Sequence, residues 1–260
     1  MEIVFFVLAG AAVGLAVGIT GVGGGSLMTP LLILFGIPYN VAIGTDLLYA
    51  AVTKAGGAVA HKRQGTVRWR LVALLAMGSI PASLATTFLL DNVFTTAGDY
   101  EALLTHSLGI MLILTSGVLL FKKRIQETSA EDGATKTWVH HHAQAITFVA
   151  GILLGVFVTL SSVGAGAFCA ALLLVLYPRL PALHVVGTDI AHAVPLTLIA
   201  GLGHLLFLGN VDFKLLGCLL IGSLPAVHFG TKLGARLPNT VLQPILASIL
   251  MVLGVKFAVF

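Results

Sequence analysis

Eight apolar runs in this chain are long enough to cross a lipid bilayer as helices. A helix needs about 20 apolar residues to cross a hydrocarbon core about 30 Å thick. The runs are Ile3–Thr20, Val41–Ala60, Trp69–Leu90, Ala102–Phe121, Gln144–Leu160, His184–Leu206, Phe213–Leu233 and Val241–Phe260. Only 9% of the 260 residues are charged, whereas a soluble domain has about 25%. The composition therefore argues against a water-soluble enzyme or a nucleic-acid-binding domain and predicts an all-α polytopic membrane protein.

The two halves of the chain contain the same motifs in the same order, which indicates an internal duplication. The repeated motifs are GVGGG at Gly21–Gly25 and SVGAG at Ser162–Gly166, GTD at Gly44–Asp46 and Gly187–Asp189, and GSIPA at Gly78–Ala82 with GSLPA at Gly222–Ala226. Chance similarity between apolar sequences would not preserve this order. We therefore divide the chain into a first transmembrane repeat, 1–121, a cytoplasmic linker, 122–143, and a second transmembrane repeat, 144–260.

Each repeat also contains one apolar run that is too short to cross a bilayer as a regular helix. These runs are Ser26–Gly36 and Ala167–Tyr177, and each follows a glycine-rich cluster. At 1.5 Å per residue, eleven helical residues extend about 16 Å, half of the membrane. Each short run either crosses the membrane as a glycine-broken segment or enters and leaves it on one side.

The basic residues predict the orientation, because cytoplasmic loops are enriched in Lys and Arg. The basic segment Lys62–Arg70 and the linker 122–143 flank an acidic segment, Asp91–Glu101, that contains no Lys or Arg. If the short runs cross, each repeat has five membrane segments and the second repeat is inverted. All 14 basic residues except Lys54, Lys214 and Lys256 are then cytoplasmic.

We therefore expect a multi-pass protein of the cell inner membrane, with two inverted-topology repeats, cytoplasmic basic loops and both termini outside. The net charge of +4 then reflects insertion topology and not a nucleic-acid partner. The alternative, in which the short runs re-enter, gives parallel halves.

The two glycine clusters are candidates for an anion-binding site. Consecutive glycines weaken a helix by about 1 kcal/mol each relative to alanine, and paired glycine-broken segments point to the binding site in inverted-repeat transporters. An unwound backbone and a helix N-terminus both offer N–H groups to an anion. The candidate substrate-binding residues are Gly23, Gly24, Gly25, Ser26, Ser161, Ser162, Gly164 and Gly166, together with Thr45 and Thr188 of the GTD motifs. The alternative is close helix packing, which also fits the spacing of Gly10, Gly14 and Gly18.

The GTD motifs place Asp46 and Asp189 near the starts of otherwise apolar segments. An ionisable residue inside a membrane marks a transport pathway by default, although each aspartate could instead be the N-cap of its helix. Helical spacing brings Tyr49, Lys54 and His192 near these carboxylates. We assign all five to proton coupling or gating, with snorkelling to the surface as the alternative for Lys54.

The chain contains no motif of a hydrolase, a zinc protease or a nucleotide-binding protein, so we expect neither an enzyme nor a cofactor. Cys169 and Cys218 lie in apolar runs and are expected to be small buried hydrophobic residues.

The first repeat resembles a known transporter family. GITGVGGGSLMTPLLILFGIP at Gly18–Pro38 and GTDLLYAAVTKAGGAVAH at Gly44–His61 resemble the TauE/SafE family of sulfite and organosulfonate exporters, which is also classed with toluene-sulfonate uptake permeases. The resemblance implies a secondary carrier for small sulfur-containing anions, driven by the proton gradient. It leaves the anion and the direction of transport open.

The residues and the resemblance together predict an exporter of small oxyanions such as sulfite, sulfonates or thiosulfate. Its expected partners are the anion, protons and the lipid bilayer, and a homodimer is possible. Two alternatives stay open: a divalent metal cation carrier that uses Asp46, Asp189 and His192, and a non-transporting membrane scaffold.

Overall fold

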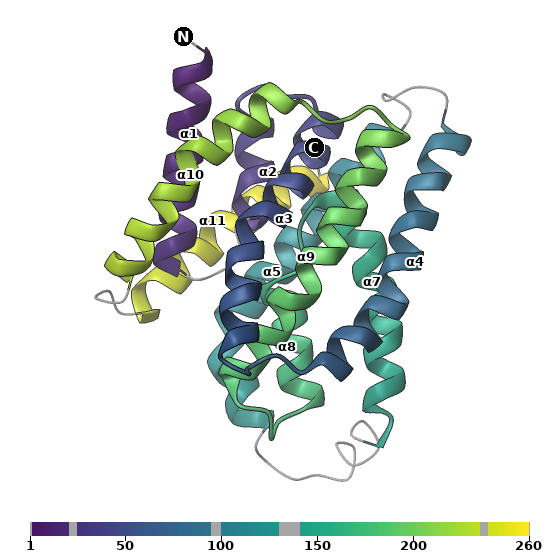
Figure 1. The fold of residues 1–260 in the computed structure, drawn as a ribbon, viewed down its shortest axis with the longest axis vertical. Helices are drawn as coiled ribbons and strands as arrows, with labels where there is room; N and C mark the ends of the chain where they lie inside the picture. Colours follow the sequence, from purple (N-terminus) through teal and green to yellow (C-terminus); the bar gives the residue numbers. More distant parts are fainter. Residues whose placement is uncertain (1, 21–24, 95–99, 130–140, 235–238, 260) are drawn as a thin grey trace.

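The computed structural model describes residues 2–20, 25–94, 100–129, 141–234 and 239–259, and within these ranges its regular structure is entirely helical (Figure 1). The helices are α1 Glu2–Thr20, α2 Gly25–Leu34, α3 Tyr39–Arg63, α4 Trp69–Val93, α5 Glu101–Ser129, α7 Ala143–Ser161, α8 Ala167–Leu176, α9 Ala182–Leu206, α10 Phe213–Gly234 and α11 Asn239–Val259. The predicted all-α class is therefore confirmed.

The lengths of the helices agree with a multi-pass membrane protein. Among the described residues, α4, α5, α7, α9 and α10 contain stretches long and apolar enough to cross a bilayer. The short runs form α2 and α8, of 10 residues each, or about 15 Å of helix. Every apolar run identified in the sequence corresponds to one of these helices.

Several helices extend beyond the predicted apolar runs, and three of these extensions have a clear cause. Helices α3 and α9 begin directly after Pro38 and Pro181, because proline has no N–H to leave unpaired at a helix start. Asp46 and Asp189 therefore lie two turns inside their helices, and the interpretation of them as N-caps is wrong. Helix α5 continues to Ser129 instead of ending at Phe121, because the predicted linker begins with good helix formers.

The two halves pack through equivalent pairs of helices. Helix α1 lies along α10, and α4 lies along α7 (Figure 1). A Cβ atom at Gly10 would lie 2.5 Å from the carbonyl oxygen of Leu219, and a Cβ at Gly151 would lie 2.5 Å from that of Leu75. Gly10 and Gly151 are equivalent positions in the repeat, so both halves use the same close contact between backbones. The close-packing interpretation is confirmed for Gly10.

Equivalent helices of the two halves run in opposite directions. Along the contact between α3 and α9, Gly201 packs on Leu48 and Gly57 faces Ile190, so the residue numbers rise in opposite senses. Helices α5 and α11 show the same relation, because Gly109 lies beside Ala258 while the Ser116 hydroxyl donates to the Ala247 carbonyl at 2.7 Å. Helix α3 is therefore antiparallel to α9, and α5 is antiparallel to α11.

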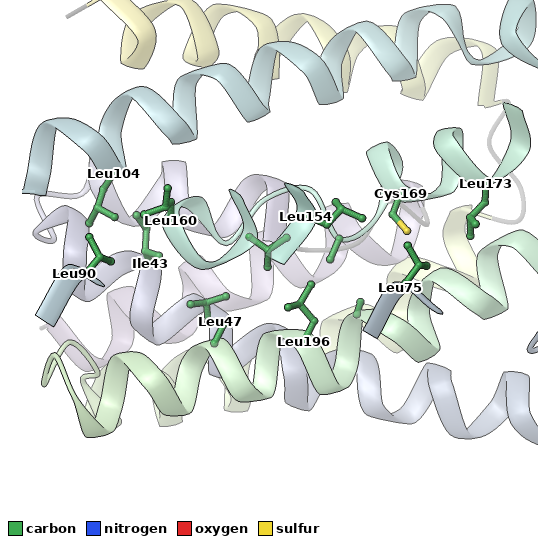
Figure 2. Close-up of a cluster of buried hydrophobic side chains, with 14 of the residues drawn as sticks. Ile43, Leu47, Leu75, Leu90, Leu104, Leu154, Leu160, Cys169, Leu173 and Leu196 are labelled. Carbon is green, nitrogen blue, oxygen red and sulfur yellow. The ribbon is translucent and has the colours of Figure 1, made fainter. Parts of the chain in front are cut away.

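The buried apolar core surrounds the central pair of helices, α3 and α9. Figure 2 shows Ile43 and Leu47 of α3, Leu196 of α9 and Cys169 of α8 in one cluster of buried side chains. Cys169 and Cys218 are both free and buried, as predicted. Polar groups on the central helices are therefore held in a dry environment, where each needs a protein partner.

Candidate functional site

The second glycine cluster is a real interruption between two helices. Helix α7 ends at Ser161 and α8 begins at Ala167. Ser162 adopts a left-handed conformation with φ 58° and donates its N–H to the Val158 carbonyl, which caps α7. Gly164 follows at φ 117°, a conformation that side chains with a Cβ rarely adopt. The glycine thus permits the chain to turn between α7 and α8.

The interruption leaves a group of backbone N–H groups without acceptors. Ser162 and Val163 donate to Val158 O and Ser161 Oγ, and pairing resumes with Cys169 and Ala170. Within the described parts of the chain, the N–H groups of residues 164–168 have no hydrogen-bond partner. These groups lie at the N-terminus of α8, where the helix dipole favours a negative charge. Unpaired N–H groups at a helix N-terminus are able to bind an anion.

The first glycine cluster leads into the short helix α2. Gly23 and Gly24 lie outside the described residues. Gly25 is the first residue of α2, and Ser26, the next residue, is buried. The helical parts on either side, α1 and α2, match α7 and α8 in position along the repeat.

Asp46 is fully buried on α3 and is bonded to α2. The Thr29 hydroxyl of α2 donates to Asp46 Oδ2 at 2.5 Å. The Ser162 hydroxyl lies near the same carboxylate, beyond hydrogen-bond geometry. Asp46 Oδ1 and Ser162 Oγ are therefore both buried without a partner among the described residues. The Asp46 carboxylate thus lies beside both the short helix α2 and the interruption between α7 and α8.

Lys54 connects the central helices to the second interruption. Its Nζ donates to the Ala165 carbonyl at 2.7 Å, so the side chain ends inside the protein and the snorkelling alternative is wrong. Asp189 and Asp46 are the acidic groups that interact electrostatically with it. The candidate proton-coupling residues Asp46, Asp189 and Lys54 therefore belong to one cluster.

His192 and Tyr49 occupy equivalent positions, three residues after the two GTD aspartates, and each faces a serine of the opposite half. His192 Nε2 lies 2.8 Å from Ser79 Oγ on α4. Tyr49 faces Ser223 on α10, and Ser79 and Ser223 are the serines of the two GS-x-PA motifs. These contacts join each central helix to the other half of the molecule.

Three of the predicted substrate-binding hydroxyls form bonds that support the fold. Thr45 Oγ1 accepts the N–H of Asp212, directly before α10, and Thr188 Oγ1 accepts the N–H of Arg68, directly before α4. Each threonine therefore binds the start of a helix in the opposite half. Ser161 Oγ donates to the Phe157 carbonyl at 2.6 Å. Helix starts have unpaired N–H groups, and the two threonines satisfy one in each half.

Comparison with known proteins identifies the family. The family model described as "Sulfite exporter TauE/SafE" matches residues 6–257. The chain belongs to the TauE/SafE family. A probable membrane transporter protein of Bacillus subtilis (strain 168), YjnA, is 39% identical over 97% of this chain and 98% of its own length. A second from the same organism, YdhB, is 28% identical over 88% of this chain and 89% of its own.

A probable membrane transporter protein of Xylella fastidiosa (strain 9a5c) is 26% identical over 87% of this chain and 83% of its own length. No solved structure matches the chain. The family and the named relatives together show that the TauE/SafE chain is a membrane transporter and not an enzyme.

Three site residues of this TauE/SafE protein escaped the sequence reasoning. Thr29, Ser79 and Cys169 lie beside Asp46, His192 and Asp189 respectively. The repeated GS-x-PA motif was a usable signal for Ser79, because the same serine recurs in both halves. Thr29 and Cys169 carry no such signal, since small polar residues are common in transmembrane helices.

The residues of the metal-carrier alternative are not arranged as a ligand set. Among the described residues, no group of three or more His, Cys, Asp and Glu side chains could hold a metal ion. His192 Nε2 is instead paired with Ser79.

Proposed function

We propose that this TauE/SafE protein is a secondary carrier that exports small sulfur-containing oxyanions such as sulfite, sulfonates or thiosulfate, coupled to protons. The observation that carries the proposal is the row of unpaired N–H groups at residues 164–168, beside Lys54 and the two buried aspartates. The amides and the ammonium group favour an anion, and the carboxylates supply groups that can take up protons. The description of the family as sulfite exporters supports the choice of anion.

The substrate site would lie between the two interrupted segments. Gly164, Gly166 and Ser162 would contribute N–H and hydroxyl donors from the second half, and Gly23 to Ser26 would contribute them from the first. A protonated aspartate no longer repels an anion, so a proton and the oxyanion can occupy the site together.

The two repeats would be inverted in the inner membrane. The antiparallel arrangement of α3 with α9 and of α5 with α11 supports this topology, because parallel repeats would orient equivalent helices in the same direction. The basic loops would be cytoplasmic, and both termini would lie outside. The short helices α2 and α8 would then return the chain across the membrane.

Transport in proteoliposomes tests the proposed substrate. Purified protein is reconstituted, and flux of radiolabelled sulfite is measured with a pH gradient of either polarity, with protein-free vesicles as the control. We expect protein-dependent sulfite flux that the pH gradient accelerates. A metal-sensitive dye inside the same vesicles tests the divalent-cation alternative, and metal accumulation without sulfite flux would overturn the proposal.

The scaffold alternative is tested in cells. Variants Asp46→Asn and Asp189→Asn, expressed at the wild-type level, should lower sulfite tolerance if the carboxylates work in transport. Full tolerance with both variants would contradict their role.

A further inference from the structure

A group of fully buried polar side chains joins helices α4, α7 and α9. We call this group the polar row, and its members are Ser79 and Ser83 of α4, Thr159 of α7, and His192 and His204 of α9, all with 0% exposure. Buried polar groups are unfavourable unless they are hydrogen-bonded. Such a concentration of hydroxyl and imidazole groups at one contact between three helices therefore needs a physical reason.

Hydrogen bonds connect the polar row from one helix to the next. His192 Nε2 lies 2.8 Å from Ser79 Oγ. One turn further along α4, Ser83 Oγ lies 2.7 Å from Thr159 Oγ1, and His204 Nε2 lies 2.9 Å from the Thr159 carbonyl oxygen. The polar row therefore accompanies α9 from His192 to His204, over about 18 Å of helix.

The polar row begins at the charged cluster of the site and ends where α9 ends. His192 lies one helical turn after Asp189 on α9, and Lys54 of α3 is the charged neighbour of both. His204 lies in the last turn of α9, which ends at the exposed residue Leu206. The polar row thus extends from a buried carboxylate to the end of a transmembrane helix.

Each histidine of the polar row has one ring nitrogen available. Nδ1 of His192 and Nδ1 of His204 are buried and have no partner among the described residues. The Thr159 carbonyl can only accept, so neutral His204 has its proton on Nε2 and a free lone pair on Nδ1. A proton that binds Nδ1 gives an imidazolium ring, and loss of a proton from either nitrogen restores the neutral ring. His204 can therefore accept a proton on one side of its ring and release one from the other.

The hydroxyl groups between the histidines can donate in either direction. Thr159 Oγ1 lies 2.7 Å from Ser83 Oγ and 2.7 Å from the Gly155 carbonyl oxygen. A hydroxyl group has one proton, and a carbonyl group only accepts. When Thr159 donates to Gly155, Ser83 is the donor to Thr159, and when Thr159 donates to Ser83 the direction is reversed. Groups that pass a proton between two histidines require this reversibility.

The first repeat packs its helices in the same way with other residue types. The glycines of this close contact are equivalent in the two repeats: Gly10 and Gly14 on α1, and Gly151 and Gly155 on α7. The positions equivalent to Ser83 and Thr159 in the first contact are Val227 and Gly18. Close packing of these helices therefore requires neither hydroxyl, although small polar residues often support such packing.

The histidine equivalent to His204 has different surroundings. His61 is half-buried near the end of α3, and its Nδ1 lies 2.8 Å from Thr66 Oγ1 in the loop that follows. His204 is instead fully buried against α7. The polar row is therefore a property of the second repeat and not a consequence of the duplication.

We infer that the polar row is the route along which the coupling proton moves between Asp189 and the end of α9, with His192 and His204 as its proton-binding groups. The inference rests on the proposed function, because it adds a proton route to the same carrier. It predicts that substitutions near the end of α9 reduce coupling to the pH gradient without preventing the binding of sulfite.

Two fluxes in proteoliposomes of the full-length protein separate the proton route from sulfite binding. Exchange of radiolabelled sulfite at equal pH needs no net proton movement, whereas flux driven by a pH gradient does, and a trapped pH-sensitive dye reports the protons. His204→Gln keeps an N–H group for the Thr159 carbonyl but cannot carry a proton. We expect gradient-driven flux and sulfite-dependent proton movement to fall about tenfold or more, with exchange within about twofold of wild type.

The matched control is His61→Gln, because His61 is equivalent in the sequence and lies outside the polar row. It should leave both fluxes close to wild type. Three results would overturn the inference: an unaltered ratio of gradient-driven flux to exchange in His204→Gln, an equal fall of both fluxes in that variant, or the same loss of coupling in His61→Gln. Absence of sulfite flux, or of its acceleration by the gradient, in the wild-type protein would instead contradict the proposed function.

A second pair of variants tests the inference even if His204→Gln does not fold. Thr159→Val removes the hydroxyl that bonds to Ser83 with little change of shape, and Thr159→Ser keeps a hydroxyl at the same position. Both variants retain the backbone carbonyl that binds His204. We expect the ratio of gradient-driven flux to exchange to be about tenfold lower in Thr159→Val than in Thr159→Ser. Equal ratios in the two variants would contradict the proton route.

Discussion

Replacing Gly151 with alanine tests the close contact that both halves use to hold their helices together. A Cβ at this position would lie 2.5 Å from the carbonyl oxygen of Leu75 and 3.2 Å from its Cα. These are backbone atoms of α4, so they cannot rotate out of the way. Helices α4 and α7 must separate locally to accept the methyl group, which weakens packing that holds membrane helices together.

The magnitude follows from comparison with a matched glycine. Gly117 on α5 has no atom within 4 Å of the Cβ that alanine would add. Both substitutions gain about 1 kcal/mol of helix propensity, so this gain cancels in their difference. Overpacking at Gly151 costs about 1–3 kcal/mol. At roughly 2–4 °C per kcal/mol for a chain of this size, a cost of about 2 kcal/mol separates the two melting temperatures by roughly 4–8 °C.

The assay is thermal unfolding of the two purified variants in the same detergent. Gly151→Ala should unfold below wild type, and Gly117→Ala should unfold at or slightly above it. Gly10→Ala, at the equivalent position on α1, should behave like Gly151→Ala because its Cβ would lie 2.5 Å from the Leu219 carbonyl oxygen. Equal melting temperatures for Gly151→Ala and Gly117→Ala would refute the reasoning.

Three further predictions follow from the hydrogen bonds and backbone angles of the site. The Thr45 hydroxyl binds the Asp212 N–H, so Thr45→Val should lower the free energy of unfolding by about 1 kcal/mol and leave the KM for sulfite within twofold. A large rise in KM would show that Thr45 contacts substrate. Ser79→Ala should lower the free energy of unfolding by about 1–2 kcal/mol, since it leaves His192 Nε2 unpaired. A chemical-denaturation midpoint equal to wild type would contradict this expected loss of stability. Gly164→Ala should lower the free energy of unfolding by about 1–3 kcal/mol, because φ at Gly164 is 117°. The loss should appear as a lower melting temperature, and a melting temperature equal to wild type would mean that the turn adapts to alanine.

The helices were largely predictable from the sequence, because hydropathy and length reflect the same bilayer thickness. All ten apolar runs correspond to helices in the described structure. The errors lie at helix ends: α3 and α9 begin earlier, and α5 extends to Ser129. Apolar length does not detect a helix start that a proline determines, nor a polar helix that continues beyond the apolar segment.

The candidate site was predictable in part. Repetition identified the GTD aspartates, and helical spacing placed Tyr49 and His192 near them. The partners of these residues could not be found in this way, because Thr29, Ser79 and Ala165 belong to other helices or to the interruption. Thr45 and Thr188 lie beside the aspartates in the sequence, but their hydroxyls cap helices of the opposite half.

The sequence by itself determined that this TauE/SafE chain is a duplicated, all-helical membrane protein whose two halves each contain an aspartate and a glycine-rich cluster. These properties are local, since they depend on the composition of each segment and on the order of the motifs. Only the tertiary structure decided that Lys54 reaches the Ala165 carbonyl and that Thr29 binds Asp46. The physical reason is that each bond joins elements distant in the chain, and packing of the helices alone determines which buried groups meet.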